Sequence, residues 1–184
     1  MIDDEEAPLG LVPLDGRGSL PFALVHGESL VAAASWAVGE SGARLYDATV
    51  PFDDVRRSGC DLLLHDPLCP LTPADFLASA AERCRETGRV VVGFRPVTDT
   101  VKVREGAHLG ATVDRDGLRL VASPVVVPAA VLVGLAALDT SDFAALVAGL
   151  AAEHPVEWLE APALAGRISN LEDLGVLEAL SHAS

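Results

Sequence analysis

The stretch Gly93–Pro124, GFRPVTDTVKVREGAHLGATVDRDGLRLVASP, decides how the rest of the chain is arranged. Its first part, Pro96–Lys102, contains a proline, two threonines, an aspartate and a lysine. Its later part, Ala111–Val121, alternates apolar and polar residues around Asp116-Gly117, which predicts a β-hairpin with its turn at Asp-Gly. We expect a long, charged β excursion of this kind where a chain meets a partner or a charged ligand.

Apolar runs and helical patterns alternate on both sides of this stretch. Buried strands are predicted at Leu9–Leu14, Arg44–Val50, Asp61–Asp66, Arg89–Val97 and Val156–Glu160. Helices are predicted at Glu28–Gly39, Thr72–Thr87, Pro128–Leu138, Ser141–Glu153 and Leu171–His182. This alternation predicts one mostly parallel, three-layer α/β domain over residues 1–184, with a β excursion leaving the sheet at about residues 97–123.

Four local predictions follow from residue type and position. Thr72 is expected to cap its helix, with Pro73 at the first helical position. Trp36 lies on the apolar face of its helix and is expected in the core. The polar segment Pro51–Gly59 is expected to be a loop, and His65 a packed histidine rather than a catalyst.

The composition excludes several classes of function. A net charge of −14 argues against nucleic-acid binding, which needs a basic surface. Residues 1–8 are expected to form an acidic, solvated tail, and their sequence is unlike a signal peptide. Leu120–Leu138 is uncharged, but Pro124 and Pro128 favour a strand followed by a helix over a membrane span. Three irregularly spaced cysteines indicate reduced thiols in a cytoplasmic protein, with no zinc pattern.

Two places near strand ends are candidates for chemistry. The turn Asp15–Ser19, with Gly16 and Gly18, follows a buried strand, where α/β folds place loops that bind nucleotide phosphates. A plain turn is the alternative. Asp66 lies just past the carboxyl end of another buried strand, a position at which ligands bind. It is a candidate to hold a divalent metal or a substrate hydroxyl, and the alternative is a turn residue before proline.

Three segments, in order, resemble the methylerythritol phosphate cytidylyltransferase family of the non-mevalonate isoprenoid pathway. Leu62–Pro70 (LLLHDPLCP) is similar to the family's LVHDAARP, and Pro96–Lys102 followed by Thr112–Arg115 matches its PVxDTxK…TVDR. Arg167–Leu174 (RISNLEDL) resembles its C-terminal KxTxPEDL, with arginine in place of lysine. Together these segments cover most of the chain from residue 60 onward.

The resemblance implies a Rossmann-like nucleotidyltransferase fold, similar to glycosyltransferase A, whose β excursion is an arm that clasps a second subunit in a homodimer. Carried over position by position, five residues fall at sugar-phosphate or metal positions: Asp66, Thr100, Arg115, Asp142 and Arg167. Asp66 is the implied ligand of magnesium. The forked guanidinium group of arginine suits the phosphate of such a ligand, and short polar side chains suit its hydroxyl groups. For Arg115 the alternative is a surface ion pair, and Lys102 is expected to be a solvated residue of the arm.

The first loop departs from the family's AAGxGxRxG…PK, whose arginine and lysine neutralise the triphosphate. Here the loop is shorter, Leu20 stands at the arginine position and Phe22 at the lysine position. Arg17 remains as the candidate catalytic cation, with Gly16 and Gly18 as the nucleotide-binding glycines. Asp15 adds a charge of the same sign as the phosphates.

Two further departures lie outside this loop. Cys69 replaces the arginine of the family's HDAAR, and the segment before Asp61 lacks the GGxxRxxS that helps to hold cytidine. The sugar-phosphate half of the site is therefore expected to be retained and the nucleotide half lost. Removing charge-stabilising groups costs roughly 10²–10³ in rate for each group.

Three functions remain open from the sequence. The first is a divergent cytidylyltransferase that joins CTP to methylerythritol phosphate with magnesium, with weak or no activity. The second is a non-catalytic, dimeric binding or regulatory protein that pairs with an active paralogue. The third is a nucleotidyl- or sugar-transferring enzyme with another substrate.

Overall fold

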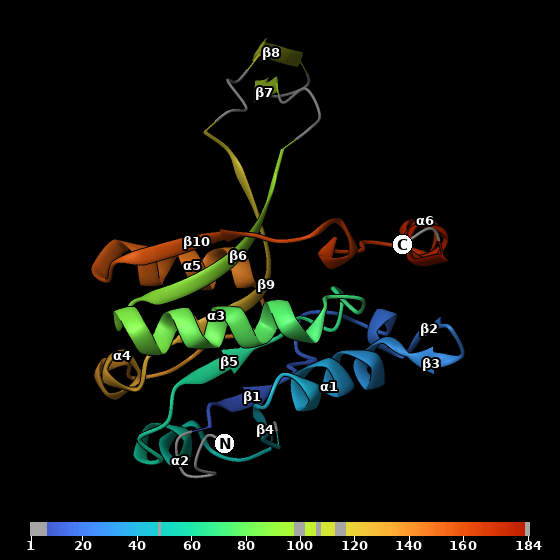
Figure 1. Ribbon diagram of the computed structural model, residues 1–184. Helices are drawn as coiled ribbons and strands as arrows, with labels where there is room; N and C mark the ends of the chain where they lie inside the picture. The colour runs from blue at the N-terminus through green and yellow to red at the C-terminus, as the bar shows by residue number, and fades with distance from the viewer. Residues whose placement is uncertain (1–6, 48, 98–101, 106–107, 113–116, 183–184) are drawn as a thin grey trace.

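The computed structural model describes residues 7–47, 49–97, 102–105, 108–112 and 117–182, of which 102–105 and 108–112 are described as backbone. Its central sheet has the strand order β10-β6-β9-β5-β1-β4 (Figure 1). The strands are β1 (Leu9–Leu11), β4 (Arg44–Leu45), β5 (Leu62–Leu64), β6 (Val90–Pro96), β9 (Arg119–Val127) and β10 (Val156–Glu160). Strand β9 is antiparallel to β5 and β6, and the other pairs are parallel.

Helices cover both faces of this sheet, as Figure 1 shows for α3 on one face and α5 on the other. The α-helices are α1 (Leu30–Glu40), α2 (Phe52–Arg57), α3 (Ala74–Thr87), α4 (Ala129–Gly134), α5 (Phe143–Glu153) and α6 (Leu171–His182). Two 3₁₀ turns, η1 (Leu20–Phe22) and η2 (Ala163–Ala165), and a small antiparallel pair, β2 (Leu24–Val25) and β3 (Glu28–Ser29), complete the described elements outside the excursion.

The alternation of side chains along each strand builds the two cores. In β5, Leu62 and Leu64 pack with α2, α4 and α5, whereas Leu63 packs with α1 and α3. Strands β6 and β9 divide their valines in the same way. Strands buried on both faces account for the continuous apolar runs in the sequence. The predicted three-layer, mostly parallel α/β fold is therefore confirmed.

The described part of the excursion contains an antiparallel strand pair that precedes Asp116-Gly117 in the sequence. Strands β7 (Lys102–Glu105) and β8 (His108–Thr112) pair with each other in a separate two-stranded sheet, and Glu105 lies opposite His108. The strand after Asp116-Gly117 is β9, which pairs with β5 and β6 instead. Because Asp116 lies outside the described residues, the predicted turn at Asp116-Gly117 stays a prediction. The arm that clasps a second subunit stays a prediction.

The segment predicted as a loop between Val50 and Asp61 contains helix α2. Asp53 and Asp54 lie in its first turn and Arg56 and Arg57 in its last, the order that suits the helix dipole. Arg56 bonds Asp53 at 2.8 Å and Arg57 bonds Asp54 at 3.2 Å. The loop prediction was wrong because these charges, three residues apart, support a short helix.

Other boundaries differ from the predictions in smaller ways. Helix α3 begins at Ala74, one residue later than predicted, and Thr72 Oγ1 donates to Cys69 O rather than capping the helix. Helix α4 ends at Gly134, well before Leu138, and β4 is limited to two residues. Ala7 is buried and Pro8 O accepts from Arg44 N, so both residues belong to the packed edge of the sheet.

Trp36 contradicts its predicted place in the core. Its side chain is 69% exposed, and the buried face of α1 is formed by the smaller Leu30, Ala34 and Val38. Helix α1 packs closely on the sheet at Gly10 of β1. A Cβ added at Gly10 would collide with the side chain of Val38 in α1. A face built of small residues leaves no volume for an indole, so Trp36 points to solvent.

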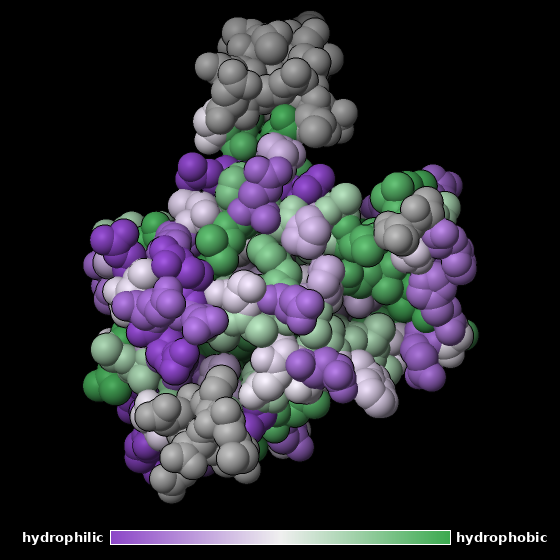
Figure 2. Space-filling model, viewed as in Figure 1, coloured by the Kyte–Doolittle hydropathy of each residue, from purple (hydrophilic) through white to green (hydrophobic). Residues whose placement is uncertain are grey.

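Ion pairs cover the C-terminal end of α3. Arg83 bonds Glu86 at 2.9 Å and Glu157 at 2.7 Å, and Arg85 bonds Glu82 at 3.3 Å. Figure 2 shows hydrophilic residues grouped over this end of the helix. Exposed pairs of this kind contribute about 0–1 kcal/mol each. These pairs therefore contribute little to the stability of the fold.

The last helix packs against the β2–β3 pair near the start of the chain. Val25 and Leu30 share a buried cluster with Leu174 and Leu177 of α6. His26 N donates to Glu178 Oε1 at 3.0 Å, across 152 positions of sequence. No helix among the described residues has the length and apolarity needed to cross a membrane.

Candidate functional site

Five segments that are far apart in the sequence meet at one cavity of about 550 Å³. They are the turn after β1, the end of β5, the start of β9, the start of α5 and the segment after β10. The residues that line the cavity are Gly16, Arg17, Asp66, Arg119, Leu120, Val121, Ser141, Asp142, Phe143, Ala144 and Arg167. The structure thus brings together five of the residues singled out in the sequence, namely Gly16, Arg17, Asp66, Asp142 and Arg167.

Asp66 and Arg17 form a buried ion pair at the base of this cavity. Arg17 Nε donates to Asp66 Oδ1 at 2.7 Å, and the two side chains are 1% and 2% exposed. Arg17 Nη1 also donates to Asp15 O at 2.6 Å and to Thr140 O at 3.0 Å. Its Cζ lies 5.0 Å from the centre of the Phe143 ring. Arg17 is therefore held on every side by the protein itself.

Arg167 occupies the other oxygen of Asp66. Its Nε donates to Asp66 Oδ2 at 3.0 Å, while its side chain stays 43% exposed. Leu68 N adds a second bond to Oδ1 at 3.0 Å. Burial alone would raise the pKa of Asp66, but the hydrogen bond and charge of Arg17, the Leu68 N–H and the charge of Arg167 together hold it below its usual value. Asp66 is thus a carboxylate neutralised from both sides.

The position of Asp66 is fixed from β9 by Ser123. Its Oγ accepts from Asp66 N at 2.8 Å and lies 2.6 Å from His65 Nδ1. His65 is fully buried, and its Nε2 has no hydrogen-bond partner among the described residues. Burial lowers the pKa of His65 to about 4, against the weaker opposing effect of the Asp66 charge. His65 is therefore a neutral, packed histidine, as expected.

The donor set at Asp66 does not suit a magnesium ion. Both carboxylate oxygens already accept bonds from arginines, and a divalent cation would lie beside two guanidinium groups. Within the part of the chain that the structure describes, no three His, Cys, Asp or Glu side chains gather as a metal site. Magnesium prefers several oxygen ligands in near-octahedral geometry. Magnesium binding at Asp66 stays a prediction that this geometry does not favour.

The remaining predicted residues are placed as follows. Gly16 has a φ of +75°, and a Cβ there would meet Ser141 O, so the turn closely approaches the start of α5. Gly18 does not line the cavity, and a Cβ there would meet open space. Thr100 and Arg115 lie outside the described residues.

Cys69, which stands where the family's HDAAR has arginine, is a buried thiol. Burial, with a smaller effect of the Asp66 charge, raises the pKa of Cys69 far above its ordinary value. It is therefore neutral and provides no positive charge to the cavity. The nearest cations to Asp66 come instead from Arg17 and Arg167.

Comparison with known proteins finds relatives of this chain, although no family model matches it. The chain is 37% identical to the bifunctional enzyme IspD/IspF of Clavibacter michiganensis over 123 residues, which are 65% of this chain and 30% of that protein. It is 31% identical to the 2-C-methyl-D-erythritol 4-phosphate cytidylyltransferase of Corynebacterium diphtheriae over 105 residues, 57% of this chain and 38% of that one. The matched regions thus span about a third of each relative.

Solved structures extend the similarity to nearly the whole chain. The 2-C-methyl-D-erythritol 4-phosphate cytidylyltransferase from Thermus thermophilus is 25% identical, has a TM-score of 0.69, and the match covers 96% of this chain and 99% of that one. The chain belongs to the IspD-like 2-C-methyl-D-erythritol 4-phosphate cytidylyltransferase family. The synthase from Anaerococcus prevotii shares the fold, with a TM-score of 0.70 at 14% identity.

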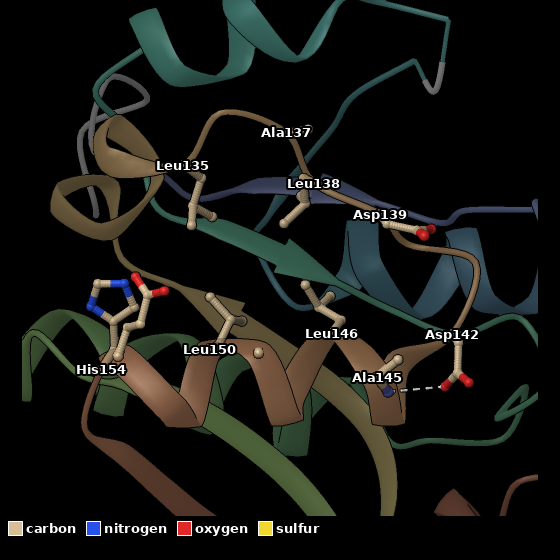
Figure 3. A pocket seen from close by; sticks show the side chains of 11 residues that line it. Leu135, Ala137, Leu138, Asp139, Asp142, Ala145, Leu146, Leu150 and His154 are labelled. Atoms are coloured by element: carbon tan, nitrogen blue, oxygen red, sulfur yellow. Dashed lines mark hydrogen bonds between the residues drawn. The ribbon is translucent and has the colours of Figure 1, made fainter.

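Asp142 of this IspD-like chain faces two cavities. Its Oδ1 accepts from Ala144 N at 2.8 Å and from Ala145 N at 3.2 Å, so the side chain caps α5. Figure 3 shows the second cavity, about 390 Å³, with Asp142 and Asp139 at one end, His154 at the other and leucines between them. Among the described residues, no arginine or lysine side chain lines this second cavity. An anionic ligand is therefore better served by the first cavity.

Sequence reasoning missed Arg119, which lines the first cavity of this IspD-like protein from β9. Its Cζ lies 5.2 Å from the centre of the Phe94 ring and 5.0 Å from that of Trp158. The alternation of residues 118–121 signals a strand but not which strands flank it. Only the pairing with β6, and of β6 with β10, brings the two rings under Arg119.

The buried His65 predicts a pH dependence of stability for this IspD-like protein. The unfolded chain takes up a proton near the usual histidine pKa of about 6.5, whereas folded His65 does so at about 4. Because the unfolded state binds more protons in this window, stability is lost as the pH falls. The free energy of unfolding is expected to drop by about 2 kcal/mol between pH 7 and pH 5, measured by urea titration.

The variant His65→Asn is the control for this experiment, because it keeps a polar atom near Ser123 without the titrating ring. Its free energy of unfolding is expected to change much less between the two pH values. Below the usual aspartate pKa, loss of the Asp66 carboxylate adds to the fall, since its folded pKa is lowered. Equal stability of the unmodified protein at pH 7 and pH 5 would show that His65 does not titrate as described.

Proposed function

We propose that this IspD-like protein binds a small phosphorylated polyol in the cavity beside Asp66 and transfers a cytidylyl group weakly or not at all. The observation that carries the proposal is the use of both Asp66 oxygens by Arg17 and Arg167. Asp66, the implied metal ligand, and Arg17, the remaining cation of the first loop, are bonded to each other. The relative from Corynebacterium diphtheriae is named for 2-C-methyl-D-erythritol 4-phosphate, and this polyol phosphate is the ligand we propose.

Nucleotidyl transfer depends on cations that stabilise charge on the phosphorus as it is transferred. Here Leu20 and Phe22 stand where the family pattern has its arginine and lysine. Arg17 makes four contacts with its own protein and has a 1% exposed side chain. A triphosphate could bind Arg17 only by displacing these contacts. The buried carboxylate of Asp66 would then lose Arg17 as a partner, which is costly.

Binding of a monophosphate makes smaller demands on the cavity. Arg167 uses Nε for Asp66, and its two terminal nitrogens make no hydrogen bond to the residues that the structure describes. A guanidinium with free terminal nitrogens suits a phosphate group, which accepts two parallel bonds. Ser141 and the start of α5 offer short polar groups to hydroxyls. We also propose that the protein is a cytoplasmic homodimer held through residues 97–123.

The test is a turnover and binding experiment on the full chain. The protein is incubated with CTP, magnesium and 2-C-methyl-D-erythritol 4-phosphate while pyrophosphate release is followed, with the Thermus thermophilus enzyme as positive control. No release above background is expected, whereas calorimetry is expected to detect the sugar phosphate but not CTP. Pyrophosphate release at a rate comparable to the control enzyme would overturn the loss of transfer activity.

The variant Arg167→Gln connects the binding to the cavity. Hydrogen bonds to charged groups contribute about 1.5–3 kcal/mol, so sugar phosphate binding is expected to weaken by roughly 10- to 100-fold. The matched control is Arg57→Gln, which removes the same charge from the exposed surface of α2. If both variants bind like the unmodified protein, the ligand does not occupy this cavity.

A further inference from the structure

Arg119 lies over two aromatic rings at the edge of the candidate cavity. Its Cζ is 5.0 Å from the ring centre of Trp158 and 5.2 Å from that of Phe94, and the two rings meet edge to face with their centres 6.1 Å apart. The three residues come from the adjacent strands β9, β6 and β10 (Figure 1). The guanidinium is thus supported from below by a row of side chains across the sheet.

The strand pairing explains which face this row occupies. Phe94 lies opposite Val121, and Trp158 lies opposite Val92, which shares its core with α5. Val121 and Trp158 both pack against that same core. Arg119 is two residues before Val121 and therefore on the same side of β9. Its guanidinium reaches the cavity on the side that also holds Arg17 and the start of α5.

Arg119 differs from the other two arginines of the cavity in its partners. Arg17 and Arg167 both bond Asp66, whereas Arg119 has no ion pair with any residue that the structure describes. The lining carries three arginines and the two carboxylates of Asp66 and Asp142, and Asp142 caps α5. A positive lining in a chain of net charge −14 is favourable for an anion.

We propose that Arg119 binds the phosphate group of the ligand together with the terminal nitrogens of Arg167, and that Phe94 and Trp158 hold Arg119 in place for this role. This inference rests on the proposed function and assigns a specific binding residue within it. An arginine that is already supported loses less freedom when it binds, so more of its interaction energy contributes to affinity. Arg119 thereby adds a second cation to Arg167 at the proposed phosphate position.

The two tryptophans of the chain, Trp36 and Trp158, make a direct readout of this contact possible. Trp36 is 69% exposed and is not among the residues that line the cavity, so Trp36→Phe is expected to leave the site intact, with Trp158 as the sole indole. A phosphate that binds the Arg119 guanidinium changes the electrostatic surroundings of the Trp158 indole, which lies directly beneath it. Titration of the Trp36→Phe protein with 2-C-methyl-D-erythritol 4-phosphate is expected to change Trp158 emission.

The variant Arg119→Gln in the Trp36→Phe background tests the assignment. It is expected to weaken binding of the sugar phosphate by roughly 10- to 100-fold in calorimetry and to abolish the change in emission. Arg57→Gln in the same background, which removes an equal charge on α2, is expected to keep both. Urea unfolding confirms that each variant is folded, which is expected because both arginines are on the surface.

The outcomes separate this inference from the proposed function. If the Trp36→Phe protein binds the sugar phosphate and Arg119→Gln binds it equally well with the same change in emission, the role of Arg119 is overturned and the proposed function stands. If the Trp36→Phe protein and the unmodified protein both fail to bind, the proposed function is wrong and the assignment of Arg119 falls with it. Inorganic phosphate as a second titrant shows whether Arg119 recognises the phosphate group itself.

Discussion

Replacing Asp66 with asparagine is expected to lower the free energy of unfolding by about 3–5 kcal/mol, the cost of removing one partner from a buried ion pair. The Arg17 side chain is 1% exposed, so without the carboxylate its charge stays buried with only carbonyl oxygens and the Phe143 ring around it. Urea or guanidinium titration of both proteins at pH 7 measures the difference.

An exposed ion pair of the same composition is the matched control. Asp54→Asn removes the partner of Arg57 on α2, where the two side chains are 44% and 73% exposed. Its cost is expected to stay below about 1 kcal/mol. If Asp66→Asn is no more destabilising than Asp54→Asn, then Arg17 reaches solvent and is available to a ligand, contrary to its buried pairing with Asp66.

Replacing Gly93 with alanine is expected to destabilise the protein by about 1–3 kcal/mol, the range for a group forced into a packed interior. The added Cβ would meet the backbone of Ser123, including its carbonyl carbon at 2.7 Å. Backbone cannot rotate away as a flexible side chain does. The pairing of β6 with β9 is irregular at this position, which is where glycine permits a close approach of two strands.

The same change is expected to reach the site, because Ser123 Oγ accepts from Asp66 N and contacts His65. A shift of Ser123 loosens both contacts, so Gly93→Ala is expected to weaken sugar phosphate binding as well as stability. The control is Gly149→Ala in α5, where a Cβ meets open space and helix propensity favours alanine by about 1 kcal/mol. Equal stability of the two variants would show that β9 can move away from Gly93.

The layers of the fold were predictable because most strands and helices have a recognisable pattern within their own stretch of sequence. Leu62, Leu63 and Leu64 form a short apolar run, which is typical of a strand buried on both faces, and Gly88 ends α3 in the left-handed conformation typical of a C-cap. Helix α2 was missed because its signal is charge order rather than apolar periodicity. Trp36 was misplaced because residue type does not reveal how closely α1 packs on the sheet.

The candidate site was only partly accessible from the sequence. Positions at the ends of strands gave Asp66 and the turn around Arg17, since such ends meet at one edge of the sheet. The ion pair between Arg17 and Asp66 joins residues 49 positions apart, and that of Arg167 with Asp66 joins residues 101 apart. No local pattern indicates such pairs, nor the support of Arg119 by two other strands.

The packing of α6 on the β2–β3 pair also has a consequence for the order of folding. The bond between His26 and Glu178 spans 152 positions, and the shared cluster joins Val25 to Leu177. Contacts of such long sequence separation form late, because closing a long loop costs entropy before the contact is gained. During synthesis on the ribosome, the β2–β3 pair cannot pack against α6 until nearly the whole chain has emerged. Until then Val25 and Leu30 lack Leu174 and Leu177, the side chains of α6 that complete their buried cluster.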